Sequence, residues 1–149
     1  MMSDLPESSE ERFSTALHGT SRMWRLAIDK RLKHLGIGQA GWMTIAMVAK
    51  SAEPMSQRAL ADLVGVEGPS MVSMLDRLER DGLVTREASP TDRRVKLVHL
   101  TEAGTILYEQ VRKEAAAVRS SLFEGIDRQA LGAAADLLEV LRTRIEEQL

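Results

Sequence analysis

The hydrophobic pattern of this chain changes its period at Asp81-Gly82. Before that point apolar residues recur at the three- and four-residue spacing of amphipathic helices. After it, residues 83–86 and 95–100 alternate as strands do, and Ser89-Pro90-Thr91-Asp92 is typical of the turn between them. Helical spacing then returns. The pattern predicts a mainly α fold with a small β-hairpin (α+β), with helices near residues 10–35, 39–50, 56–64, 68–80, 101–123 and 128–147.

Residues 56–80 have the pattern of a helix-turn-helix. Its first helix has an apolar face made of Leu60, Ala61 and Val64, and Val66 is placed to fill the angle after the turn at Gly65. We expect the facing stripe of the second helix to be Val72, Leu75 and Leu78. The outward side chains are then Ser70, Ser73, Met74 and Arg77. A DNA-reading helix pair and a helical hairpin of a bundle both fit this spacing.

The hairpin that follows favours a winged helix, in which the second helix enters the major groove and the hairpin reaches the backbone or the minor groove. Asp92 and Arg94 are two residues apart, so they share a face near the tip. The carboxylate is expected to hold a guanidinium in a fixed direction, so that Arg93 or Arg94 enters the minor groove. A surface ion pair worth ~0–1 kcal/mol is the alternative.

Charge gives only partial support to this interpretation. Residues 55–100 contain seven basic and seven acidic side chains, so their formal charges cancel. The basic side chains concentrate in the expected wing, where Glu87 and Asp92 oppose Arg86, Arg93, Arg94 and Lys96. A monomer would make few phosphate contacts, which favours a protein that binds DNA as two copies.

The terminal helices are long for a chain of 149 residues. Behind a flexible tail at residues 1–9, we expect a single domain at 10–149. Its lobe at 36–100 would be the winged helix-turn-helix, and residues 10–35 and 101–149 would supply dimerisation helices. A two-fold dimer would present its recognition helices about 34 Å apart and select a palindromic operator. A monomer whose terminal helices fold onto its own lobe is the alternative.

Composition argues against several other classes. The chain has no cysteine, which excludes disulfides and thiolate metal sites, and its three histidines lack metal spacing. We expect no cofactor, no metal and no enzymatic activity, because nothing resembles a catalytic triad or a phosphate-binding loop. The acidic N-terminus and the lack of a long apolar run predict a cytoplasmic protein. A winged helix used only for protein interaction remains an alternative function.

The sequence resembles the MarR family of bacterial transcription regulators, and most closely its SlyA branch. Three segments carry the resemblance. DRRVKLVHLT fits the family's wing signature D-x-R-x-x-x-x-x-L-T, and MSQRALADLVGVEGPSMVSMLDRLERDGLVTR resembles its helix-turn-helix. MWRLAIDKRLKHLGI and the following GWMTI resemble the SlyA branch. The resemblance implies a homodimer, repression at pseudopalindromic promoter sites, and DNA contacts by the side chains singled out above. Ser73 departs from the arginine common in SlyA-like proteins, so the SlyA operator is not expected to transfer.

The resemblance also implies an effector site for a small aromatic carboxylate between the dimer helices and the winged helix. Its expected residues are Arg25, Trp42, Met43 and Ala46. A guanidinium beside an indole suits a carboxylate on an aromatic ring. A core tryptophan and a surface or interface arginine are the alternative for this pair.

Overall fold

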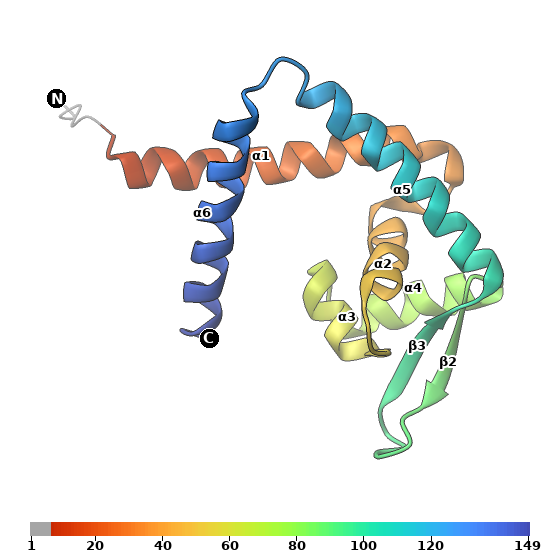
Figure 1. Cartoon of the computed structure of the whole chain (residues 1–149). Coiled ribbons are helices and arrows are strands. Elements are labelled where there is room, and N and C mark those ends of the chain that lie inside the picture. The colour runs from red at the N-terminus through yellow and green to blue at the C-terminus, as the bar shows by residue number, and fades with distance from the viewer. Residues whose placement is uncertain (1–6) are drawn as a thin grey trace, which may run out of the picture. The chain divides into compact units, whose positions relative to one another are not determined.

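The computed structural model describes residues 7–149, so most of the tail expected at 1–9 lies outside the described residues. Within this range the chain is mainly helical with one small antiparallel sheet, which confirms the predicted fold class (Figure 1). The elements are α1 (Ser9–Leu32), the 3-10 turn η1 (Lys33–Leu35), α2 (Gly38–Lys50), β1 (Met55–Ser56), α3 (Gln57–Val64), α4 (Gly68–Arg80), β2 (Val84–Ala88), β3 (Lys96–Leu100), α5 (Glu102–Leu122) and α6 (Arg128–Glu146).

The contacts divide the chain into two compact units, with the boundary between Val118 and Arg119. The first unit holds α1 to β3 and most of α5, and the second holds the end of α5 and α6. None of the helices formed by residues 7–149 has the length and apolar character needed to cross a membrane.

Helix α1 begins and ends at local signals. Ser8 accepts a hydrogen bond from the Glu11 amide, and the Glu11 carboxylate accepts one from the Ser8 amide, so the two residues form a capping box. The regular helix ends at Leu32 instead of the expected residue 35, because the last turn tightens into η1. Gly36 then adopts the left-handed conformation at φ 70° and ends the segment.

The helix-turn-helix is bounded by local signals at its helix ends. The Ser56 hydroxyl accepts from the Ala59 amide at 3.1 Å and starts α3. Gly65 ends it at φ 78°, a conformation that favours glycine. Pro69 lies in the first turn of α4, where its missing N–H breaks no intrahelical hydrogen bond. The turn therefore directs α4 across α3 without backbone strain.

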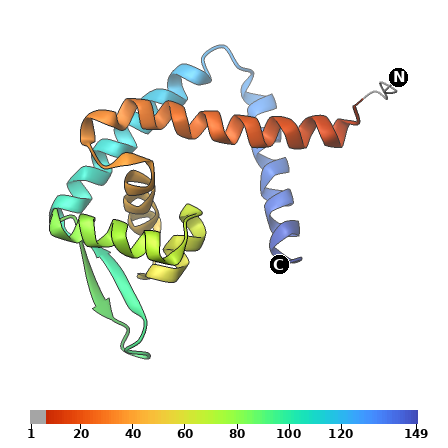
Figure 2. The same ribbon diagram turned by 180° about the vertical axis from the view of Figure 1, so that it is seen from behind.

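The sheet has the order β1-β3-β2. Strands β2 and β3 form the predicted hairpin, with Val84 opposite Leu100 and Ala88 opposite Lys96. The strands are displaced by one or two residues from the expected 83–86 and 95–100. The sequence did not predict β1, because a two-residue strand shows no alternation; it pairs Met55 with Val98. Both views show β2 and β3 extending past α4 as a ribbon (Figures 1 and 2).

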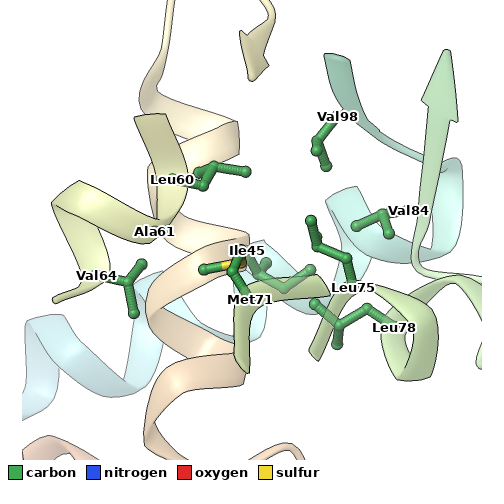
Figure 3. Close-up of a cluster of buried hydrophobic side chains, with 9 residues drawn as sticks. All are labelled: Ile45, Leu60, Ala61, Val64, Met71, Leu75, Leu78, Val84 and Val98. Atoms are coloured by element: carbon green, nitrogen blue, oxygen red, sulfur yellow. The ribbon is translucent and has the colours of Figure 1, made fainter. Parts of the chain in front are cut away.

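One apolar core joins α2, α3 and α4 to the sheet (Figure 3). From α4 it receives Met71, Leu75 and Leu78, all with no exposed surface, and Val84 and Val98 cover them from the strands. The expected stripe was wrong at one position: Val72 is 39% exposed and Met71 takes its place. Both residues have helical spacing to the rest of the stripe, and the direction of the neighbouring helices decides between them.

A second apolar cluster joins α1, α2 and α5. It consists of Ile28, Leu32, Ile37, Trp42 and Val111. On its rim Arg31 on α1 donates to the Glu114 carboxylate on α5 at 2.7 Å. These contacts hold the first part of α5 against the long N-terminal helix.

The hairpin is joined to α5 by a close contact. Thr101 caps α5: its hydroxyl accepts from the Gly104 amide and donates to the Gly82 carbonyl oxygen. Gly104 packs so tightly on the loop before β2 that a Cβ at this position would overlap the Leu83 carbonyl oxygen. Glycine is therefore required here for the approach of α5 to the base of the wing.

Helix α6 begins at Asp127, whose carboxylate accepts from the amides of Gln129 and Ala130. None of its residues, 128–146, is buried in the described chain. Of its apolar side chains, Leu131 and Leu141 are half-buried. The large exposed apolar side chains of α6 are Leu137, Leu138, Val140 and Ile145.

Candidate nucleic-acid interface

The outer face of α4 holds the four residues predicted to face outward. Ser70, Ser73 and Arg77 are exposed, and Met74 is half-buried. With Pro69 they line a shallow hollow of about 420 Å³. This surface lies opposite the buried stripe, as a helix that enters a groove requires.

Arg77 is held by a contact that sequence spacing does not show. Its Nη2 donates to the Ile37 carbonyl oxygen at 2.7 Å, just before α2, and lies 3.8 Å from the Met74 sulfur. Gly41 lies beside this contact: a Cβ there would be crowded at 3.1 Å from the Ile37 Cβ, but would lie at an ordinary contact distance of 3.7 Å from the guanidinium. Arg77 therefore links the outer face of α4 to the start of α2.

Arg86 connects the wing to α4. From β2 its Nη2 contacts Asp76 and Glu79 on α4, each at 2.6 Å, and its Nη1 donates to the Gln57 side chain on α3 at 3.1 Å. The Glu79 hydrogen bond raises the pKa of Arg86 above its usual value, and the side chain is only 17% exposed. A fork with five donors suits this bridge better than a lysine would.

Sequence reasoning placed Arg86 among the DNA contacts and missed its three partners. Asp76 and Glu79 are three residues apart, so they share one face of α4, but nothing in the sequence shows that β2 lies beside that face. The structure gives the Arg86 guanidinium partners within the protein and places it between the helix and the wing.

The tip of the wing is organised by Asp92. Its carboxylate accepts from the Arg94 amide at 3.0 Å and from the Arg94 Nε and Nη2 at 3.2 and 3.3 Å. These hydrogen bonds lower the pKa of Asp92 below its usual range, so the carboxylate is charged at neutral pH. The Arg94 side chain nevertheless keeps 91% of its surface exposed. Asp92 thus orients Arg94 while leaving its outer edge accessible.

The neighbouring basic side chains of the wing extend into solvent. Arg93 and Lys96 are exposed, and neither forms an ion pair with any residue between 7 and 149. Together with Arg94 they give the wing three accessible positive charges. The result is a polar helix face beside a cationic ribbon, which matches the two contacts of a winged helix on a duplex.

The sequence model of the MarR family matches residues 47–96, from the end of α2 to the start of β3. Among solved structures, the transcriptional regulator PA3341 is 39% identical and has a TM-score of 0.82, over 91% of this chain and 98% of that one.

The chain belongs to the MarR family. With the winged-helix fold, this membership supports a DNA-binding transcriptional regulator, since the family and the similar solved structures are transcriptional regulators.

Two further structures qualify the comparison. CouR from Rhodococcus jostii RHA1, solved with bound p-coumaroyl-CoA, is 27% identical with a TM-score of 0.74, over 91% of this chain and 94% of that one. The regulator SlyA is 18% identical with a TM-score of 0.76, over 91% and 95% of the two chains. The latter likeness shows the fold alone and does not single out the SlyA branch.

The four residues expected at an effector site lie in two different environments. Trp42 is buried in the cluster of α1, α2 and α5, and its Nε1 donates to the Asp29 carboxylate at 3.2 Å. Met43 is half-buried between the two cores and Ala46 is buried. Arg25 is exposed on α1, one turn before Asp29. The Asp29 carboxylate thus already accepts a hydrogen bond from the indole, and Arg25 precedes it by one turn of the same helix.

Proposed function

We propose that this MarR-family protein is a homodimeric, sequence-specific DNA-binding regulator that acts in the cytoplasm as a repressor. In this proposal α4 enters the major groove, and the wing reaches the adjacent minor groove with Arg93 or Arg94. The observation that carries it is the Arg86 bridge, because a wing fixed to α4 by Asp76 and Glu79, and to α3 by Gln57, delivers both contacts at a set distance.

The other residues predicted to contact DNA have different roles in this proposal. Ser70, Ser73 and Met74 lie on the groove face of α4, while Arg77 supports that face through Ile37. Lys96 and the arginines of the tip contact phosphates or the minor groove. Arg86 is assigned a positioning part, since its guanidinium is already shared among Asp76, Glu79 and Gln57.

Dimerisation is proposed through α1, the end of α5 and α6. The support is the apolar side chains that these segments expose, including Leu122 at the end of α5, Ile126 in the loop after it, and Leu137 and Leu138 on α6. Exposed apolar surface of this kind marks an interaction surface where it is contiguous. A second copy provides the matching surface by symmetry, and two-fold symmetry fits a palindromic site.

An aromatic anion is the proposed effector. CouR was solved with p-coumaroyl-CoA, an aromatic acyl thioester, which supports a ligand of this kind for a related fold. In the present chain Arg25 would attract the anion, and Trp42, Met43 and Ala46 would supply the apolar wall. Membership of the SlyA branch stays a prediction that rests on the segments quoted from the sequence.

The test is selection of bound duplexes from a random pool at about 0.15 M salt, followed by sequencing. We expect a palindromic motif whose half-sites are about one helical turn apart. Weak, salt-sensitive binding without any motif would contradict the proposal. It would favour a protein-interaction module, which the even charge balance of residues 55–100 also permits.

Arg94→Ala and Arg93→Ala then test the wing on the selected duplex. Replacing the arginine that enters the minor groove should weaken binding more than replacing its neighbour. It should also reduce the slope of log K against log salt concentration by about one. Arg25→Ala tests the effector site: it should reduce the response to aromatic carboxylates more than the affinity for DNA. Equal affinity for DNA in the wild type and in both wing variants would refute the wing contact.

A further inference from the structure

The exposed first two turns of α4 carry only short or apolar side chains. Pro69, Ser70, Val72 and Ser73 are all exposed. Val72 has 39% of its surface exposed, although its neighbours on the same helix, Met71 and Leu75, are fully buried in the core. In a helix-turn-helix the N-terminal turns of the second helix approach the base edges most closely. These side chains therefore determine what the helix can recognise.

The long charged side chains of α4 have other partners. Arg77 donates to the Ile37 carbonyl oxygen, and Asp76 and Glu79 accept from Arg86. Arg80 lies in the last turn, beyond the turns that approach base edges. A guanidinium or ammonium group is consequently missing from the first two turns, residues 68–75, where a bidentate pair with guanine would form.

Val72 lies on the side of α4 that faces the wing. Val72, Asp76 and Glu79 follow one another at spacings of four and three residues, so they share one face of the helix. The two carboxylates of this face bind Arg86 from β2. Val72 is therefore placed along the edge of α4 next to the ribbon, where a duplex in contact with both elements would pass.

From these positions we infer that α4 reads thymine through its methyl group, with Val72 and Pro69 as the apolar contacts. The C5 methyl of thymine is the one apolar feature of the major groove, and apolar side chains recognise it. Ser70 and Ser73 border the hollow on the outer face and hydrogen-bond to any base, so they add little discrimination. The operator half-site should contain required thymines and no guanine that is required by α4.

This inference rests on the proposed function, and its test begins with the duplex that the selection yields. Each thymine of one half-site is replaced in turn by deoxyuridine, which removes the methyl and keeps the Watson–Crick pair. At one or two positions we expect affinity to fall about fourfold, the effect of losing roughly one methyl from an apolar contact.

Protein variants separate contact from DNA flexibility. In Val72→Ala the uracil effect at the contacted position should shrink toward none, because the methyl has already lost its partner. Leu63→Ala is the matched control, an exposed leucine on α3 that loses a comparable apolar group, and it should keep the full uracil effect. Ser73→Arg introduces a long cation at the centre of the outer face, and selection with this variant should yield a guanine that the wild type does not require.

The outcomes distinguish the two proposals. Absence of any selected motif contradicts the proposed function. A motif with required guanines opposite α4 and no response to uracil leaves that function intact and overturns the thymine inference. A uracil effect of equal size in the wild type and in Val72→Ala also overturns it, since the effect then comes from the DNA itself.

Discussion

Helices α4 and α6 differ in where their apolar surface goes. Helix α4 has 13 residues and places three side chains, Met71, Leu75 and Leu78, fully inside the core of its own chain. Helix α6 has 19 residues and places none of them in the interior of the described chain. Complete burial of each such α4 side chain stabilises the fold by about 1.5–3 kcal/mol.

The difference indicates what each helix is for. Helix α4 is fixed by its own chain, so its polar face can be held at a set position beside the wing. Helix α6 leaves Leu137, Leu138, Val140 and Ile145 between 42% and 55% exposed, and a group of such side chains on one helix marks a candidate interaction surface. The proposed reading surface thus lies within one chain, whereas the proposed interface is completed by a second copy.

Leu75→Ala tests the α4 side and should have the largest effect. Leu75 is fully buried between α4 and the sheet, so truncation leaves a cavity. We expect the free energy of unfolding to fall by about 2–5 kcal/mol, measured by urea denaturation at one protein concentration. A loss below about 1 kcal/mol would mean that the core does not hold α4 as described.

Leu138→Glu tests the α6 side. A carboxylate in an apolar interface loses its hydration without gaining a partner, so the dimer dissociation constant should rise at least tenfold, about 1.4 kcal/mol. Sedimentation velocity over a dilution series measures it. Leu138→Met, which conserves volume, is the control and should remain dimeric. A Leu138→Glu protein with an unchanged dissociation constant would exclude this face of α6 from the interface.

Arg86→Lys sharpens the link between α4 and the wing. Lysine keeps the charge but cannot reach Asp76, Glu79 and Gln57 together. Because both carboxylates are about half exposed, we expect a stability loss of only about 1 kcal/mol, with faster amide exchange in β2. Exchange in β2 that matches the wild type would show that the bridge does not fix the wing.

The smallest effect concerns pH at the wing tip. Arg94 lowers the pKa of Asp92 below 3.8, so this pair stabilises the tip above that pH and the contribution is lost as pH falls through the lower, folded-state value. An NMR titration of the Asp92 carboxyl should give a lower midpoint in the wild type than in Arg94→Ala. Identical midpoints would contradict the contact.

Local signals made much of the fold predictable. Ser56, Gly65 and Thr101 act at helix ends through atoms three or four residues away, and all three caps are present in the structure. The hairpin was predictable because alternation replaces helical spacing at Gly82. The choice between Met71 and Val72 was not, since both fit the helical period and only the packed neighbours distinguish them.

The site was harder to predict because its contacts join distant parts of the chain. Arg77 binds a carbonyl oxygen 40 residues away, and Arg86 binds Asp76 across the junction of helix and strand. Backbone acceptors leave no mark in a sequence. The contact of Asp92 with Arg94 was predicted, but for a different reason: both residues lie in the turn between β2 and β3, where an aspartate accepts from the amide two residues later.

The most direct measurement is the number of chains bound per duplex, determined by sedimentation equilibrium on the selected operator and on a duplex with one half-site scrambled. We expect two chains on the intact operator and a clear loss of affinity when either half-site is scrambled. One chain per duplex, bound equally well to the intact and the scrambled operator, would contradict the claim that two copies complete the DNA-reading protein.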